Sequence, residues 1–316
     1  MSQVPEAEIE ARLLAYAEGR VHPQVRAWSN TTTITANLQE EMEGDLERYQ
    51  SDALAAEFRH HCAVAGAEQD DYKNRFTHVG ELELLTGIRF RGLDMTQPFV
   101  DVIYQSRPAL SSEQVTEIKD ELRAEYAVFL PKRLRVYQPS HLKPLPGDGD
   151  KRLIAAPLQV VSESTRGEEG ISLRPARSLE FYPDYAAIYT QLHAEHPELI
   201  PVTRAESEDD LKSYLAAGNL FSIYVDETWA GVCAVFSEVS AGIRGFCFGE
   251  IVLEPAFRGL RLGSLVQQRL AAHLLERGED PNAFLFGTIG SVNEPAKRAA
   301  ARAGRLDLGG HVWLDL

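Results

Sequence analysis

The sequence predicts a mixed α/β protein of two domains, with the more clearly defined domain in the C-terminal half. Three observations lead to this prediction. At 316 residues the chain is long enough for two domains. Helix-like and strand-like patterns alternate along its length. A strand, a glycine-containing turn and an amphipathic helix follow one another over residues 249–272.

Residues 1–145 are expected to form an N-terminal α/β domain, and residues 146–169 a linker. The elements predicted from apolar spacing are helices within 5–28, over 38–62 and over 111–128, and strands within 76–105 and over 133–138. A threonine-rich stretch at 29–35 has strand propensity. The linker is predicted because residues 143–150 are rich in Pro, Gly and Asp, which favour turns.

Residues 170–316 are expected to form a second domain with a mostly antiparallel sheet flanked by helices. Its predicted elements follow the order β-α-α-β-β-β-α-β-α-β. Ser207 is expected to cap the second helix, whose acidic first turn is typical of a helix N-terminus. Asn293 is expected to cap the last helix, and Gly304 to end it. The segment 305–316 is predicted to form two strands that bend at Gly309.

The composition restricts the environment and the partners. A formal net charge of −15 argues against nonspecific binding to nucleic acid or to an anionic membrane. It suits a cationic substrate such as an amine, although solubility alone also accounts for it. The chain has no apolar run of transmembrane length, and its N-terminus is acidic and polar, unlike a signal peptide. With three scattered cysteines, we expect a cytoplasmic protein without a disulfide framework.

Metal ligands cluster at one place only, where His60, His61 and Cys62 are adjacent. Adjacent residues on a helix point in different directions and cannot readily chelate one ion. No C-x-x-C pair occurs in the sequence. We therefore expect neither a structural nor a catalytic metal.

The stretch that carries chemistry is the turn between the strand at 250–253 and the helix near Leu262. This turn, 258–263, reads RGLRLG and so contains two glycines and two arginines. Glycine lets backbone N–H groups approach a ligand, and a helix N-terminus adds free N–H donors and the positive end of a dipole. The pattern predicts a seat for a phosphate or pyrophosphate, with an ordinary tight turn as the structural alternative. The Walker pattern is absent.

With its flanking residues, the turn resembles the pyrophosphate motif of the GNAT superfamily of acyl-CoA-dependent N-acyltransferases. That motif, Arg/Gln-x-x-Gly-x-Gly/Ala, follows a strand that ends in an apolar-x-Pro step, here 253–255. Arg258 fills the first motif position and Gly263 the last, whereas Arg261 stands where the family usually has its middle glycine. The resemblance covers about 170–316. The N-terminal domain would be either a degenerate GNAT-like copy without this loop or a distinct accessory domain.

The resemblance implies transfer of an acetyl group from acetyl-CoA to a primary amine of a small molecule or peptide, by direct attack on the thioester and without a metal. The implied acetyl-CoA-binding residues are Val252, Leu253, Arg258, Gly259, Leu260, Arg261, Leu262, Gly263, Ser264 and Asn293. The backbone of Val252 and Leu253 would hold the acetyl carbonyl and the pantetheine arm. Asn293 would contact the same arm and also cap its helix.

Glu250 is the candidate general base. A lone carboxylate in an apolar, half-buried strand is expected to have a raised pKa, and family members often place a glutamate on this strand. A solvent-facing or salt-bridged glutamate is the structural alternative, and Glu238 is a second candidate base. The family often carries a tyrosine as the thiolate acid, but Ala300 occupies that position here and Arg305 that of a later aromatic residue. The candidate replacements are Tyr182, Tyr185, Tyr189, Tyr224 or solvent.

The missing tyrosine leaves a second function open, a catalytically weak or inactive GNAT-fold module that binds CoA or a partner. The sequence does not identify the acceptor amine or the acyl group. A homodimer formed through strand exchange is one assembly that the sequence allows.

Overall fold

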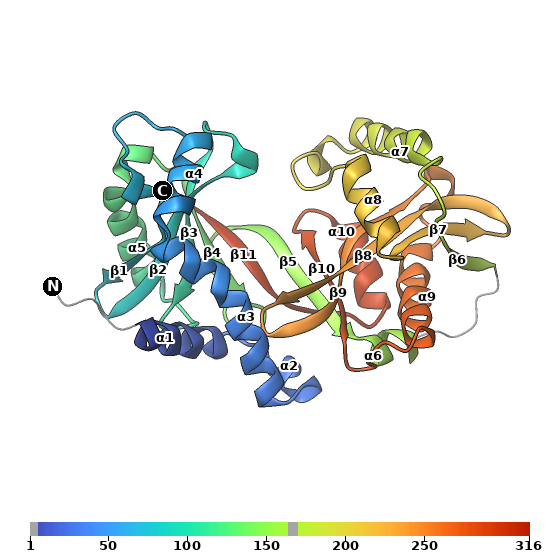
Figure 1. Cartoon of the computed structure of the whole chain (residues 1–316), viewed down its shortest axis with the longest axis horizontal. Helices are drawn as coiled ribbons and strands as arrows, with labels where there is room; N and C mark the ends of the chain where they lie inside the picture. Colours follow the sequence, from blue (N-terminus) through green and yellow to red (C-terminus); the bar gives the residue numbers. More distant parts are fainter. Residues whose placement is uncertain (1–5, 164–169) are drawn as a thin grey trace. The chain divides into compact units, whose positions relative to one another are not determined.

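The computed structural model of the chain describes residues 6–163 and 170–316. These residues form two compact units (Figure 1). The first unit comprises the described residues up to Asp150, together with Val239–Gly242 and Gly309–Leu316. The second comprises Lys151–Glu238 and Ile243–Leu308, as far as they are described. None of the described helices is long and apolar enough to cross a membrane.

The first unit combines helices with a sheet of five strands. Its helices are α1 (Glu6–Gly19), α2 (Pro23–Trp28), α3 (Thr31–Gln50), α4 (Asp52–His61) and α5 (Ser112–Glu125), with short 3-10 turns η1 (Gln69–Tyr72), η2 (Arg91–Leu93) and η3 (Ala127–Phe129). Its strands lie in the order β1 (Arg75–Val79), β2 (Leu82–Phe90), β3 (Pro98–Gln105), β4 (Arg133–Pro139) and β11 (Leu306–Asp315). Neighbouring strands are antiparallel except for β3 and β4, which are parallel.

The core of the first unit lies on one face of this sheet. The strand residues that build it include Val100, Val102, Leu134 and Val136, and α5 contributes Val115, Ile118 and Leu122. Side chains alternate between the two faces of a strand. Asp101 and Arg135, which stand between these core residues in the sequence, therefore point to the opposite face.

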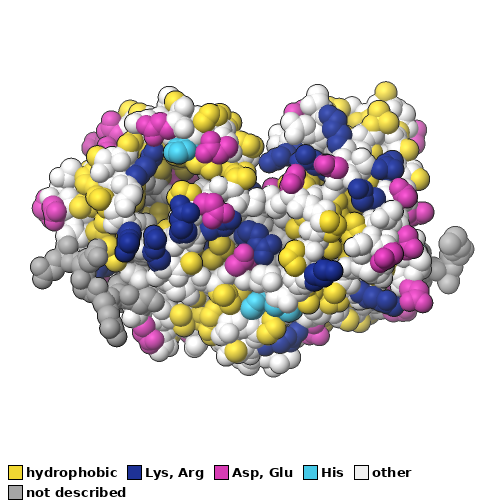
Figure 2. All heavy atoms as spheres, turned by 180° about the vertical axis from the view of Figure 1, so that it is seen from behind, with side chains coloured by type: hydrophobic (Ala, Val, Ile, Leu, Met, Phe, Trp, Pro, Cys, Tyr) yellow, Lys and Arg dark blue, Asp and Glu magenta, His cyan; other side chains and the backbone are white. Residues whose placement is uncertain are grey.

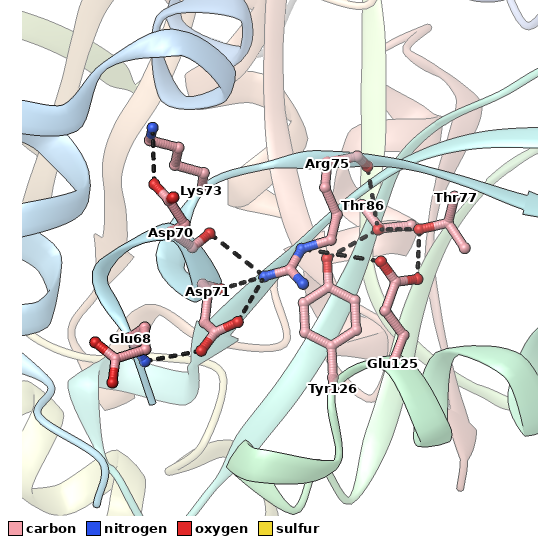
Figure 3. A network of polar contacts seen from close by, with 9 residues as sticks. All are labelled: Glu68, Asp70, Asp71, Lys73, Arg75, Thr77, Thr86, Glu125 and Tyr126. Carbon is pink, nitrogen blue, oxygen red and sulfur yellow. Dashed lines mark hydrogen bonds and ion pairs between the residues drawn. The ribbon is translucent and has the colours of Figure 1, made fainter. Parts of the chain in front are cut away.

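A polar network ties η1 to β1 and α5 in the first unit (Figure 3). The Thr77 hydroxyl donates to Glu125 Oε2 at 2.6 Å, and Arg75 Nη2 donates to the carbonyl oxygen of Asp71 at 2.8 Å. The Arg75 guanidinium also lies 4.8 Å from the centre of the Tyr126 ring. These contacts anchor β1, the first strand in the order, to η1 and to α5.

The second unit carries the strand, turn and helix on which the functional prediction rests. Its helices are α6 (Leu158–Glu163), α7 (Tyr182–Glu195), α8 (Glu208–Ala216), α9 (Leu262–Glu276) and α10 (Glu294–Arg302), with turns η4 (Pro197–Leu199) and η5 (Pro255–Phe257). Its strands lie in the order β5 (Asp148–Pro157), β10 (Phe284–Gly290), β9 (Ile243–Leu253), β8 (Thr228–Ser240), β7 (Leu220–Val225) and β6 (Ile171–Pro175). The pair β10–β9 is parallel, and β5–β10, β8–β7 and β7–β6 are antiparallel. The predicted fold class, a mostly antiparallel sheet flanked by helices, is confirmed.

The two units repeat one pattern of connections. In each, a strand leads through a helix into a parallel neighbour, β3–α5–β4 in the first unit and β9–α9–β10 in the second. The parallel neighbour then pairs antiparallel with a strand that comes from elsewhere in the chain. In the first unit β11 pairs with β4 in this way, and in the second unit β5 pairs with β10. The shared pattern favours a degenerate copy over a distinct accessory domain in the N-terminal half.

The two units divide between Asp150 and Lys151, within the range 146–169. The described residues of this range include β5 and α6, and residues 164–169 lie outside the described residues. In the Pro/Gly-rich stretch before β5, Gly147 serves a close contact, since a Cβ atom at this position would lie 2.2 Å from the Trp313 carbonyl oxygen. The predicted closing pair of strands is the single strand β11, because Gly309 and Gly310 both pair with β4 and continue it without a bend.

The threonine-rich stretch at 29–35 enters a helix, not a strand. The Asn30 side chain accepts a hydrogen bond from the Thr33 N–H at 2.9 Å and caps α3. This cap outweighs the strand propensity of the threonines. The long helix predicted over 38–62 is two helices, because Ser51 ends α3 and caps α4 by accepting from the Leu54 N–H at 3.2 Å.

Candidate active site

Glu250 lies near the end of β9 and is buried, with 4% of its surface exposed. Its Oε1 accepts hydrogen bonds from the Tyr189 hydroxyl and from the Ile251 N–H, both at 2.8 Å. Its Oε2 accepts from the hydroxyls of Tyr185 and Tyr189. The two tyrosines are four residues apart on α7 and therefore share one face of that helix. Both belong to the set of candidate acids, and the structure brings them to the candidate base.

The protonation of this group is set mainly by burial. Burial raises the pKa of Glu250 to about 7, although the hydrogen bonds from Tyr185, Tyr189 and Ile251 act in the opposite direction. Burial also raises the pKa of Tyr185 and of Tyr189, and the charge of Glu250 raises them further. The tyrosines therefore stay protonated donors while the carboxyl group titrates near neutral pH.

A row of rings along α7 holds these hydroxyls in place. Ring centres are 5.8 Å apart for Tyr182 and Tyr185, 5.5 Å for Tyr185 and Tyr189, and 5.9 Å for Tyr189 and His193. The Tyr185 hydroxyl also accepts a hydrogen bond from the Glu206 N–H at 2.6 Å. Tyr185 is thus fixed from two sides and is fully buried, whereas Tyr189 is only half-buried.

The other candidates for acid and base lie elsewhere in the second unit. Glu238 is exposed, although partial burial of its carboxyl group raises its pKa. The Arg174 guanidinium stacks on the Tyr224 ring, 4.2 Å from the ring centre. Ala300 is fully buried and offers no polar atom at the position of the family's acid. Among the described residues, only Tyr185, Tyr189 and Ile251 hydrogen-bond to the Glu250 carboxylate.

The site stands where β9 and β10 part. In the described residues these strands pair at three positions, the last of them Phe286 with Cys247. Beyond it β9 continues to Leu253 without β10 as a neighbour. Glu250, Val252 and Leu253 all lie on this unpaired stretch. The backbone polar groups on that side of β9 are therefore left without a partner from β10.

Arg258 follows β9 through the short turn η5. Its Nε donates to the Leu253 carbonyl oxygen at 3.1 Å, and its Nη1 lies 3.6 Å from Glu195 Oε2. Its Nη2 is buried and has no hydrogen-bond partner among the described residues. Buried donors are nearly always paired in native proteins, so this nitrogen is a place for a ligand acceptor.

The turn into α9 exposes its backbone. Gly259 has a φ of +78°, and a Cβ atom there would meet nothing, while Leu260 is 59% exposed. Arg261 also has a positive φ of +63°, in the left-handed region that favours glycine, and it precedes the first residue of α9. The Ser264 hydroxyl donates to the Arg261 carbonyl oxygen at 2.9 Å and steadies this conformation.

The remaining predicted cofactor residues have structural tasks of their own. A Cβ atom on Gly263 would lie 3.3 Å from the Ala299 Cβ, so this glycine allows α9 and α10 to approach each other. Leu262 and Val252 have buried side chains, which leaves only their backbone for a ligand. Asn293 caps α10, as predicted, by accepting from the Ala296 N–H at 3.2 Å.

The buried contacts of Arg305 are a feature that the sequence did not reveal. Arg305 is buried and donates to Gln267 Oε1 at 2.9 Å and to the Ile154 carbonyl oxygen at 2.5 Å. Its guanidinium lies 4.9 Å from the Phe248 ring centre, and burial lowers its pKa to about 9. In the sequence it is only a charged residue after a helix-ending glycine, a position typical of solvent-exposed residues. It links β5, α9 and β9 behind the site.

The described residues contain no group of three His, Cys, Asp or Glu side chains placed to hold a metal ion. His60 and His61 are both exposed on α4. Their only ion-pair contact is a distance of 3.9 Å between His61 Nε2 and Glu57 Oε1, as far as the chain is described.

No family model and no curated protein matches the chain. Solved structures do resemble it. They include GNAT-family N-acetyltransferases. One, from Colwellia psychrerythraea, is 12% identical, with 84% of this chain and 96% of that chain covered and a TM-score of 0.48. A GCN5-related N-acetyltransferase from Sphaerobacter thermophilus is 15% identical, with 85% and 94% covered and a TM-score of 0.47.

A further similar structure is described as a tandem GNAT protein. This protein of the clavulanic acid biosynthesis pathway, solved without acetyl-CoA, is 12% identical, with 84% of this chain and 96% of that chain covered and a TM-score of 0.41. These GNAT similarities are low in identity and concern the fold. The function proposed next therefore rests on the side chains of this chain.

Proposed function

We propose that the second unit is an N-acetyltransferase that transfers an acetyl group from acetyl-CoA to a primary amine, with Glu250 as the general base. One observation carries this proposal. Glu250, on the unpaired stretch of β9, is a buried carboxyl group with a pKa of about 7. Two tyrosines of α7 donate hydrogen bonds to it. A group whose pKa lies near the working pH is suited to accept a proton from an attacking amine.

The reaction forms a C–N bond to the acetyl group and breaks its C–S bond. The amine nitrogen must lose a proton, and the departing thiolate must gain one. Both Glu250 oxygens already accept hydrogen bonds, so the amine proton passes through Tyr189, the half-buried member of the pair. The Tyr189 oxygen takes the amine proton as its own proton moves to Glu250. Solvent protonates the thiolate, because Ala300 has no acidic atom to offer.

Acetyl-CoA supplies the activated acetyl group, and several features of this chain fit it. The buried Nη2 of Arg258 lacks an acceptor, and Gly259 leaves open space in front of the turn. The N-terminus of α9 adds backbone donors for a pyrophosphate. Arg261 would contribute a further guanidinium. The backbone of Val252 and Leu253 would face the pantetheine arm where β10 no longer pairs with β9, and Asn293 would contact the same arm.

The charge of the molecule suits the amine substrate. The net charge of −15 attracts a cationic amine. The surface is nevertheless uneven, and the face in Figure 2 shows Lys and Arg side chains gathered in clusters among scattered Asp and Glu. The amine itself is proposed only by class, as a primary amine of a small molecule or a peptide.

Calorimetric titration of the full chain with acetyl-CoA, with CoA and NAD as comparators, tests the cofactor first. We expect acetyl-CoA and CoA to bind at one site per chain and NAD not to bind. A panel of primary amines then tests turnover. Binding without turnover of any amine would favour the alternative, a CoA-binding module that lacks activity because of Ala300. An absence of acetyl-CoA binding would overturn the acetyltransferase and leave, of the alternative, only a module that binds a partner.

A further inference from the structure

The first unit contains a cavity of about 270 Å³ that the proposed acetyl transfer does not use. Its wall carries four arginines, Arg20, Arg48, Arg89 and Arg135, and we call it the arginine cavity. All of its lining residues belong to the first unit. It is therefore a candidate site of that unit alone.

The arginine cavity arises where a charged sheet face is covered by a helix. Asp101 and Arg135 point away from the hydrophobic core because they alternate with core residues along β3 and β4. On α3, Glu41, Asp45 and Arg48 recur at helical spacing and share one face. Charged side chains of the sheet and of the helix thus line the same enclosed space.

Some of these charges are satisfied within the protein. Arg135 binds Asp101 through two hydrogen bonds, 2.9 Å from Nε to Oδ1 and 2.5 Å from Nη2 to Oδ2. The Glu41 carboxylate accepts hydrogen bonds from the backbone of Ala241 and Gly242. Burial lowers the pKa of His311 to about 4, so this side chain is neutral at pH 7.

The other guanidinium groups lack a carboxylate partner. Arg89 donates only to neutral oxygens, the Ile88 carbonyl and the Asn74 side chain, each at 2.8 Å. Arg20 donates to the Ile103 carbonyl oxygen at 2.7 Å. The Arg48 side chain makes no hydrogen bond or ion pair with any residue that the structure describes, and it is exposed.

Asp45 is the matching unpaired acid. Its carboxylate makes no hydrogen bond and no ion pair at contact distance with the described residues. It nevertheless feels the charges of Arg89, Arg48 and Arg20, and burial raises its pKa. The wall of the arginine cavity therefore carries guanidinium groups and the Asp45 carboxylate, which form no ion pair with each other at contact distance. Arg89 and Asp45 are partly buried charges without an oppositely charged partner at contact distance, so a guest that carries both signs would pair with each of them.

We propose that the arginine cavity binds a small zwitterion of the α-amino acid type, with its carboxylate on Arg48 and Arg89 and its ammonium group on Asp45. Guanidinium groups match the planar geometry of a carboxylate. A cavity of about 270 Å³ offers room for a small amino acid. The proposal does not rest on the acetyltransferase activity.

The repeated pattern of the two units supports a ligand site here. Asp101 lies on β3, and Glu250 lies on β9, the strand with the same connections in the second unit. Each is a buried carboxylate on the strand that leads through a helix into a parallel neighbour. The first unit lacks the glycine turn before its helix, since residues 106–111 contain no glycine. The first unit therefore lacks the predicted cofactor loop, but it has a buried carboxylate, that of Asp101, on the corresponding strand β3.

Calorimetric titration of the full chain with each of the common α-amino acids tests the proposal. The comparators are the deaminated hydroxy acid, the decarboxylated amine and inorganic phosphate. We expect one or a few amino acids to bind at one site per chain, and each comparator to bind at least tenfold more weakly. Arg48→Gln removes a guanidinium group that would bind the ligand carboxylate, so it should weaken amino acid binding at least tenfold. The variant should still fold, because the Arg48 side chain is exposed and makes no hydrogen bond or ion pair within the described residues that folding would lose. Asp45→Asn should have the same effect.

Two control variants make the result specific. Arg59→Gln removes an exposed arginine of α4 that does not line the arginine cavity, and it should leave the affinity unchanged. Glu250→Gln should also leave it unchanged, which distinguishes this site from an acceptor site in the second unit. If no amino acid binds at millimolar concentration, the proposal is overturned. Equal binding of phosphate or of the hydroxy acid, or equal losses in Arg48→Gln and Arg59→Gln, would also overturn it.

Discussion

The Tyr189 hydroxyl lies 2.8 Å from Oε1 and 3.0 Å from Oε2 of Glu250, so one donor spans both oxygens of the buried carboxylate. Tyr185, one turn away on α7, reaches only Oε2 and is itself tied to the Glu206 N–H. Tyr189 is therefore the member of the pair that connects a buried acid with a less buried position. In the proposed reaction, Glu250 accepts the amine proton and Tyr189 relays it.

Replacing Glu250 with glutamine should slow turnover without weakening acetyl-CoA binding. Glutamine keeps the volume of the side chain but cannot take up the amine proton, and loss of a general base lowers the rate by about 10²–10⁴-fold. Steady-state kinetics measure kcat, and calorimetry measures the Kd of acetyl-CoA. The matched control is Glu238→Gln, an exposed glutamate on β8, which should retain full activity. An unchanged kcat in Glu250→Gln would exclude this residue as the base.

The activity should depend on pH through the Glu250 carboxyl group. Because the base must be ionised and its pKa is about 7, kcat/KM should rise with pH and level off above that value. Tyr189→Phe removes a hydrogen bond that lowers this pKa, so the midpoint should move to higher pH and kcat should fall. Tyr182→Phe is the control, because Tyr182 contacts the Tyr185 ring but does not hydrogen-bond to Glu250. A midpoint that stays the same in Tyr189→Phe would contradict the assignment.

Glu250 should also make the stability of the protein depend on pH. Its pKa is raised in the folded state from 4.5 to about 7, so the folded state binds this proton more tightly than the unfolded chain does. The resulting stabilisation is complete below the unfolded pKa and is lost as pH rises through 7, a change of at most about 3 kcal/mol. Urea unfolding of the wild type and of Glu250→Gln on both sides of this window measures it. The difference between the two proteins should shrink at low pH; a constant difference would mean that Glu250 is not protonated on folding.

Replacing Arg261 with glycine should stabilise the protein and weaken acetyl-CoA binding. Arg261 has a φ of +63°, a conformation that costs a non-glycine residue about 1–2 kcal/mol, and the exposed guanidinium would be lost from the proposed pyrophosphate seat. Leu93→Gly is the matched control, because Leu93 also has a φ of +61° and is 70% exposed but lies in the first unit. Both variants should raise the free energy of unfolding, and only Arg261→Gly should raise the Kd. Equal Kd values would remove Arg261 from the site.

Replacing Gly231 with alanine should disrupt the strand that carries the site. A Cβ atom at Gly231 would lie 2.1 Å from the Val252 carbonyl oxygen, and φ is +149°. We expect a loss of more than about 2 kcal/mol of unfolding free energy, together with weaker acetyl-CoA binding, because β9 must move. Gly278→Ala is the control. Its φ of +88° is also unfavourable for alanine, but a Cβ atom there meets nothing. The free energy of unfolding should therefore fall by only about 1 kcal/mol. Similar losses in both variants would mean that β8 and β9 separate easily.

The sequence predicted those parts of the molecule that depend on local chemistry. Ser207 and Asn293 cap their helices as expected, because a cap involves residues only three positions apart. Glu250 was identified because a lone carboxylate in an apolar strand contrasts with its neighbours. The two tyrosines that bind it stand more than 60 residues away. They were only two of four candidate tyrosines, because no local pattern links α7 to β9.

What the sequence missed depends on long-range packing. Arg305 is buried through contacts with Gln267 and Ile154, which come from α9 and β5, and nothing near position 305 indicates those neighbours. Gly147 lies in a Pro/Gly-rich stretch whose composition gives no sign of the close approach to the Trp313 carbonyl oxygen. The arginine cavity escaped notice for the same reason, since its charges are spread over residues 20–311.

The last strand has a consequence for how the chain becomes folded during synthesis. Gly309–Leu316 belongs to the first unit, where Val312 and Leu314 enter the hydrophobic core beside β4. These residues follow the whole second unit in the order of translation. A nascent first unit therefore leaves the ribosome with one edge of its sheet unfinished, and it must wait for the second unit to emerge before that edge is closed. The first unit is therefore completed late, even though its helices and its first four strands are made first.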